Sequence, residues 1–182
     1  AEELLHSAPG SVAESTMARV LSAEPDHPAT KAMKLWGDDE DDFTRLIGGT
    51  SPAALAWQQE VMDVLKVLQP VSSGQTLWRG WKFNDPAPRE TVMATVIQKG
   101  VSTVERAGMS VSTEMAQTLK PKFMNEQGVI WEIRKPRSAR PVGEIFTTLN
   151  TKYPTEKEAI LPRGSSLLLL EGPTKRPFDL GG

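Results

Sequence analysis

The stretch Glu156-Lys157-Glu158-Ala159-Ile160-Leu161-Pro162 places two carboxylates directly before an apolar run. An apolar run that follows a turn-rich stretch predicts a β-strand, and residues two apart on a strand share a face. Glu156 and Glu158 would then lie side by side, with Lys157 turned away. Taken alone, such a tripeptide is most often a solvated strand start. Two like charges held together in a cleft are instead typical of chemistry.

A second strand pattern, Leu77-Trp78-Arg79-Gly80-Trp81, carries one cation among apolar residues. Burying an arginine between two tryptophans is costly unless the guanidinium has an anionic partner. The glycine beside it allows a ligand to approach the backbone closely. This strand therefore predicts an anion-binding position at Arg79.

Hydroxyl groups alternate along a third extended segment, Gly108-Met109-Ser110-Val111-Ser112-Thr113, so that Ser110 and Ser112 share a face. Residues 128–133 follow as another strand pattern, rich in β-branched and aromatic residues. In chain order the sequence therefore has an arginine strand, a Ser-x-Ser strand and a Glu-x-Glu strand. Each motif is weak alone, but the ordered set is specific.

This ordered set resembles the arginine/serine/glutamate class of mono-ADP-ribosyltransferases, which includes bacterial toxins that modify arginine and related bacteriophage enzymes. The resemblance covers residues 74 to about 172. Residues 77–80 are similar to the family's arginine strand, and residues 156–162 to its Glu-x-Glu signature. Residues 110–112 are similar to its Ser-Thr-Ser motif, with valine at the centre. Residues 1–73 match the family poorly.

The resemblance implies an α+β protein with the ADP-ribosyltransferase-like fold. In that fold, N-terminal helices pack on two small, mainly antiparallel sheets around an NAD cleft. We expect residues 1–73 to form an N-terminal helical part and residues 74–182 the catalytic core, together making one domain.

The resemblance also assigns roles on the NAD side of the site. Glu158 would stabilise positive charge on the ribose, and Arg79 would bind the diphosphate. Gly80 would leave its backbone open to the nicotinamide amide. Ser110 would hold Glu158 or the ribose, and Ser112 would support it. NAD is then a substrate, and no metal is expected.

Three more residues take roles from the resemblance. Glu156 would orient the acceptor and take its proton, which favours arginine as the target side chain. Tyr153 would lie in the target-recognition turn, and Phe123 would contact nicotinamide.

Two alternatives share these residues. An NAD glycohydrolase would use water as the acceptor, and an inactive binding module would keep the fold without activity. The intact Arg79, Ser110 and Glu158 set argues against the inactive module. A histidine dyad has no support, because His6 and His27 lie far from the motifs.

Composition agrees with an ordinary globular chain, at 38 % hydrophobic and 24 % charged residues. A net charge of −2 provides no general attraction for nucleic acid or anionic membranes, and no apolar run is long enough to cross a bilayer. The absence of cysteine excludes disulfides and thiolate metal sites. We expect as partners a host or target protein that presents arginine, and an immunity or carrier protein. We expect secretion or injection into a target cell and activity in its cytoplasm.

Local signals predict helices over residues 11–22, 52–68, 89–98 and 113–119, and strands over 75–81, 108–112, 128–134, 141–146, 157–161 and 165–171. Ser51 as the N-cap and Pro52 at the first position mark the start of the second helix. Its helical spacing predicts an apolar stripe that consists of Leu55, Val61, Met62, Leu65 and Leu68. The acidic run at residues 38–42 is interpreted as the first turn of a helix that carries Phe43, Leu46 and Ile47. A metal site there is a minor alternative, since the spaced ligands of an EF-hand are missing.

Overall fold

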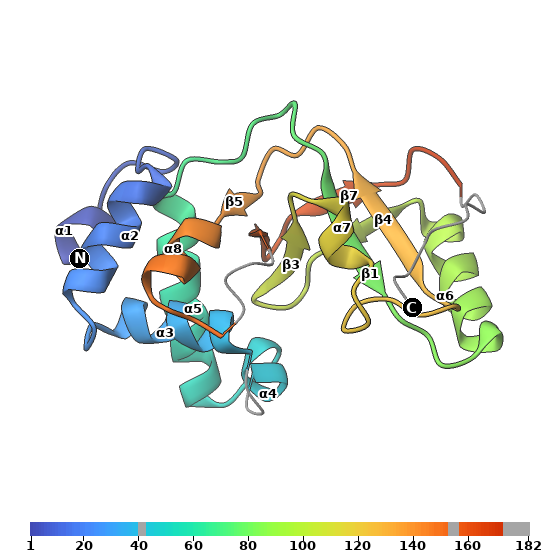
Figure 1. Cartoon of the computed structure of the whole chain (residues 1–182), viewed down its shortest axis with the longest axis horizontal. Coiled ribbons are helices and arrows are strands. Elements are labelled where there is room, and N and C mark those ends of the chain that lie inside the picture. Colours follow the sequence, from blue (N-terminus) through green and yellow to red (C-terminus); the bar gives the residue numbers. More distant parts are fainter. Residues whose placement is uncertain (40–42, 153–156, 173–182) are drawn as a thin grey trace.

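The first third of the chain is helical. The computed structural model describes residues 1–39, 43–152 and 157–172, and Figure 1 shows the helices gathered at one end of the molecule. The helices of this part are α1 (Glu2–Leu5), α2 (Glu14–Ala23), α3 (Pro28–Asp38), α4 (Phe43–Ile47) and α5 (Pro52–Val67).

Helix α5 begins where the sequence places its start signal. The Ser51 side chain accepts a hydrogen bond from the Ala54 backbone N–H at 3.2 Å, and Pro52 occupies the first turn. The buried face includes Trp57, Val61 and Leu65. Leu55, which the helical spacing assigns to the apolar stripe, is 47 % exposed, whereas Trp57 is buried in the larger apolar cluster.

The second part of the described chain contains two small antiparallel sheets. The larger has the strand order β4-β1-β3-β6-β5, and the smaller pairs β2 with β7. Their bounds are β1 (Leu77–Trp81), β2 (Val101–Thr103), β3 (Gly108–Ser112), β4 (Val129–Ile133), β5 (Arg140–Pro141), β6 (Glu158–Pro162) and β7 (Ser166–Leu168). The predicted α+β class is therefore confirmed at this level, with helices and two antiparallel sheets.

A long helix and a short helix accompany the sheets. Helix α6 (Pro86–Lys99) follows β1 and ends at Gly100, whose φ of 67° suits a left-handed cap. Helix α7 (Met115–Thr118) follows β3. Figure 1 shows α6 at the far end of the molecule from α1 and α2.

The strand predicted over residues 141–146 is wrong. Only Arg140 and Pro141 pair with β6, and helix α8 (Gly143–Thr148) follows at once. In the helical form, Ile145 and Phe146 are both buried in the helical core. Helix α8 packs mainly on α2 and also contacts α3, so the helical layer combines two separate stretches of sequence.

Strand β6 separates two apolar clusters. Ile160 is buried in the larger cluster with the helices, whereas Ala159 and Leu161 belong to a smaller cluster on the other face of the sheet. This division follows from the alternation of side chains along a strand. The smaller cluster consists of Leu77, Val104, Val111, Ile133, Ala139, Ala159 and Leu161.

The acidic run does not start a helix at its first residues. Asp38 is the last residue of α3, and Asp39 has a left-handed φ of 46° that ends the helix. Residues 40–42 lie outside the described ranges, and α4 begins at Phe43. Among the described residues, no group of acidic, histidine or cysteine side chains is arranged to hold a metal ion.

Within the same ranges, no helix combines the length and apolar character that a membrane span requires.

Candidate active site

Arg79 projects from the middle of β1. Its neighbour across the ladder is Trp131 of β4, and its Nη1 donates to the carbonyl oxygen of Ser110 at 2.6 Å. Strands β1 and β3 are paired at one position, Trp78 with Ser112. The Arg79 hydrogen bond therefore links the two strands just beyond this residue pair. Burial lowers the pKa of the Arg79 guanidinium, and the nearby Glu158 carboxylate opposes that shift. Since arginine starts from a very high pKa, the group stays a cation.

Glu158 is the first residue of β6, and its carboxylate contacts Ser110. Ser110 Oγ donates to Glu158 Oε2 at 2.8 Å. The pairing of β3 with β6 sets Ser112 opposite Glu158 and Ser110 opposite Ile160. The side chains of these four residues therefore project from the same face of the sheet. The structure therefore brings Arg79, Ser110 and Glu158 together through Ser110, although they are distant in sequence.

A second donor to this carboxylate comes from the helical part. Trp36 Nε1 of α3 lies 2.7 Å from Glu158 Oε2 and 3.0 Å from Ser110 Oγ. The sequence motifs did not indicate this residue. The available signal was general: a tryptophan in a buried position needs a partner for its N–H.

Ser112 has a different local role from Ser110. It is buried, and its Oγ accepts a hydrogen bond from the Glu114 backbone N–H at 3.1 Å. This contact fixes the end of β3 against the turn that leads into α7. The support of the site that is expected from Ser112 stays a prediction.

The side of Gly80 on which a side chain would stand is filled by the protein itself. A Cβ at this position would lie 2.8 Å from the carbonyl oxygen of Phe123 and 2.9 Å from that of Thr118. The end of α7 and the loop after it therefore approach β1 as closely as glycine allows. Gly80 also lines the large cleft, and the expected approach of nicotinamide to its backbone stays a prediction.

Phe123 lies in that loop, beside the motif strands. Lys122 Nζ is 5.2 Å from the centre of the Phe123 ring and 3.2 Å from Asp39 Oδ2. The loop thereby connects β1 to the end of α3, on the helical side of the site.

The described part of the Glu-x-Glu motif consists of Lys157 and Glu158. Strand β6 begins at Glu158, and Lys157 before it has a φ of 51°, in the left-handed region. A side-by-side arrangement of Glu156 and Glu158 therefore cannot be inferred from a continuous strand. Glu156 and Tyr153 themselves lie outside the described residues.

Arg79, Ser110 and Glu158 line one large cleft of about 2120 Å³, together with Trp36, Gly80 and Phe123. Single ligand sites usually occupy roughly 300–1,000 Å³. The cleft is therefore larger than a typical site for one small ligand.

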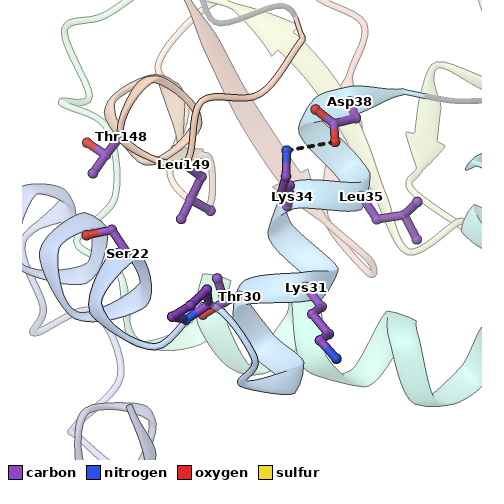
Figure 2. A pocket seen from close by; sticks show the side chains of 9 residues that line it. Ser22, Thr30, Lys31, Lys34, Leu35, Asp38, Thr148 and Leu149 are labelled. Atoms are coloured by element: carbon purple, nitrogen blue, oxygen red, sulfur yellow. Dashed lines mark hydrogen bonds and ion pairs between the residues drawn. The ribbon is translucent and has the colours of Figure 1, made fainter.

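A smaller hollow of about 440 Å³ lies between α2, α3 and α8 (Figure 2). Lys34 and Asp38 form an ion pair of 3.1 Å along its wall, and Leu35 and Leu149 also line it. It contains none of the motif residues, so the larger cleft is the candidate site.

The arrangement can perform two electrostatic tasks. A carboxylate held by Ser110 and Trp36 can stabilise a cation that develops beside it, without reorganising. A partly buried guanidinium can bind an anion strongly, because burial weakens its competing interaction with water. The site therefore suits a substrate that is anionic at one point and becomes cationic at another.

Neither the scan against protein-family models nor the search of curated proteins found a match for this chain.

Proposed function

We propose that the chain is a mono-ADP-ribosyltransferase that transfers ADP-ribose from NAD to a protein side chain, with arginine as the acceptor. The observation that carries this proposal is the contact series from Arg79 through Ser110 to Glu158 in one cleft. The order of the arginine, serine and glutamate motifs along the chain supports the same assignment.

In the proposed reaction, the bond between the nicotinamide nitrogen and the ribose carbon breaks. Its electron pair leaves with neutral nicotinamide, and the sugar gains oxocarbenium character, as in glycoside cleavage. A carboxylate at the position of Glu158 would stabilise that charge. Its fixed hydrogen bonds from Ser110 and Trp36 support this role, because a preorganised group stabilises a transition state without first reorienting.

Arg79 would bind the diphosphate of NAD. A guanidinium has five N–H donors in a planar fork, and the contact with Ser110 uses one of them. The remaining donors suit the bidentate geometry of phosphate oxygens.

The acceptor nitrogen would then attack the sugar carbon and lose a proton. A guanidinium is a weak nucleophile, so a carboxylate must orient it and accept that proton. The resemblance gives this role to Glu156, with Tyr153 in the turn that presents the target. If water replaces the guanidinium as acceptor, the same site acts as an NAD glycohydrolase.

The test is incubation of the chain with NAD labelled in its adenylate part and a cell lysate, followed by a gel and an assay of nicotinamide release. Glu158→Gln should remove both label transfer and nicotinamide release, at roughly 3–4 kcal/mol of lost transition-state stabilisation. Glu144→Gln is the matched control, because this exposed glutamate lies on α8 and does not line the cleft. Wild-type activity in Glu158→Gln, or none in the wild-type chain with any lysate, would contradict the proposal.

A second variant separates transfer from hydrolysis. Glu156→Gln should abolish transfer to protein and leave NAD hydrolysis. Water can attack the sugar carbon without a carboxylate that accepts a proton from a guanidinium. Tyr153→Ala should act in the same direction, more weakly. Equal loss of both activities in Glu156→Gln would mean that this residue acts on NAD, and the preference for arginine would lose its basis.

A further inference from the structure

Trp36 connects the helical part of the chain to the candidate active site. It belongs to α3, 122 residues before Glu158 in the sequence, and its side chain is buried. An indole has a single N–H donor and no acceptor. Here that donor is shared between Glu158 Oε2 at 2.7 Å and Ser110 Oγ at 3.0 Å.

These contacts form a closed triangle. Ser110 Oγ donates to the same Glu158 oxygen at 2.8 Å, so two donors meet on Oε2. The indole N–H also contacts the Ser110 oxygen, which leaves the Ser110 proton directed at the carboxylate. Trp36 can therefore fix the orientation of Glu158 directly and through Ser110.

The indole ring is itself held from several sides. It stacks on Trp57 with ring centres 5.6 Å apart and an angle of 18° between planes, and it meets Phe43 edge-on at 5.2 Å. A Cβ on Gly108 of β3 would lie 3.1 Å from the outer edge of the Trp36 ring, so the ring is also packed on the sheet. A ring fixed in this way cannot follow the carboxylate if the carboxylate moves.

We propose that Trp36 is a positioning residue, which holds the Glu158 carboxylate in the orientation that the reaction requires. The helical part is then a component of the active site, in addition to its packing role. The catalytic side of this inference rests on the proposed function, whereas the hydrogen bond between Trp36 and Glu158 does not.

The activity test compares Trp36→Phe with Trp57→Phe in the full chain. Both changes keep an aromatic ring in the stack and remove one N–H. The Trp57 N–H donates to the backbone oxygen of Ala32 at 3.2 Å, away from the cleft. Trp36→Phe should lower kcat for nicotinamide release by about 10- to 100-fold, because small displacements of a catalytic group have effects of this size. The KM for NAD should change by less than about threefold, since binding through Arg79 is retained.

Trp57→Phe should keep kcat within about threefold of the wild type. The hydrogen bond that it removes is of similar kind but does not reach the Glu158 carboxylate. Equal losses of kcat in the two variants, or wild-type kcat in Trp36→Phe, would overturn the positioning role.

A spectroscopic test does not depend on activity. In the 15N-labelled protein, the indole N–H signal of Trp36 is assigned by its loss in Trp36→Phe or, if that variant does not fold, in Trp36→His. Glu158→Gln should shift this signal and leave the Trp57 indole signal in place. An unmoved Trp36 signal would overturn the inference. If the wild-type chain releases no nicotinamide, the proposed function fails, and the indole signal still decides whether Trp36 holds the carboxylate.

Discussion

The helical and sheet regions of this molecule bury apolar surface very differently. Among the described residues, the larger apolar cluster, to which the helices contribute most members, contains 20 buried side chains, whereas the smaller cluster on the other face of the sheet contains seven. In the same part of the chain, the exposed large apolar side chains are Leu55 in the helical region and Trp81, Ile97, Val101, Leu168 and Leu170 in the sheet region. The helical region therefore contributes more of the stabilisation that comes from apolar burial, since this stabilisation scales with buried apolar area.

The candidate site lies where these two regions meet. Arg79, Ser110 and Glu158 come from the sheet region, and Trp36 comes from the helical region. An open, lightly packed sheet can provide a cleft for a large substrate, while a well-packed helical layer can hold one critical side chain still. The following predictions test this division of tasks.

The largest effect is expected from Phe146→Ala, which removes a fully buried ring of α8 from the larger cluster. The free energy of unfolding should fall by about 3–5 kcal/mol. Leu168→Ala, at a side chain that is 68 % exposed on β7, should change it by less than about 0.5 kcal/mol. Urea unfolding followed by circular dichroism measures both. Similar losses in the two variants would show that the regions contribute equally.

A smaller effect is expected from Gly80→Ala, in the sheet region. The new methyl group would meet the backbone oxygens of Thr118, at the end of α7, and of Phe123, in the loop after it, so that this segment must shift. The free energy of unfolding should fall by about 1–3 kcal/mol, and nicotinamide release should fall with it. Gly172→Ala is the control for stability, because no atom of the described residues lies within 4 Å of a Cβ there. A wild-type melting temperature in Gly80→Ala would contradict the close approach.

Glu14 makes the stability of the helical region depend on pH. Burial between α2 and α8 raises the pKa of its carboxyl above 4.5, against the opposing hydrogen bond from the Glu144 backbone N–H. The folded state then binds this proton more tightly than the unfolded state. Its contribution to stability is present below pH 4.5 and is lost as the pH rises through the raised pKa.

Glu14→Gln should therefore flatten the fall in unfolding free energy on the alkaline side of pH 4.5. Urea unfolding at a series of pH values measures the slope, and Glu3→Gln, an exposed change on α1, is the control. A steeper fall in Glu14→Gln than in the wild type would reverse the sign of this argument.

The smallest effect concerns the ion pair between Lys122 and Asp39, which joins the α7 loop to the end of α3. Both side chains are more than a third exposed, so water and salt screen their attraction. A double-mutant cycle of Lys122→Ala and Asp39→Asn should give a coupling of about 0–1 kcal/mol that decreases at high salt. A coupling above 2 kcal/mol would mean that the two regions are joined much more firmly than this contact allows.

Local sequence signals were sufficient where one residue type decides the conformation. Ser51 and Pro52 predicted the start of α5, and the β-branched and aromatic run at residues 128–133 predicted β4. They failed at residues 143–148, because Ile145 and Phe146 can be buried in either a strand or a helix, and packing against α2 decides between them. The short β2 was also missed, since its partner β7 lies more than 60 residues away.

The residues of the candidate site also divide into those that local sequence signals identify and those that they do not. Arg79, Ser110 and Glu158 belong to short motifs and could be identified from sequence, and the structure joins them. Trp36 could not, because a tryptophan in a helix gives no indication of which distant carboxylate its N–H will reach. The conformation of Lys157 was also unpredictable, since lysine rarely adopts a left-handed φ and no glycine marks the position.

The position of α8 has a consequence for the order in which the chain folds during synthesis. The larger cluster needs Val142, Ile145 and Phe146, which leave the ribosome long after α1 to α5 have been made. Until then, α2 exposes the apolar face that α8 later covers. While translation proceeds, the N-terminal segment therefore lacks part of its apolar cluster, and it exposes apolar surface of the kind that chaperones bind.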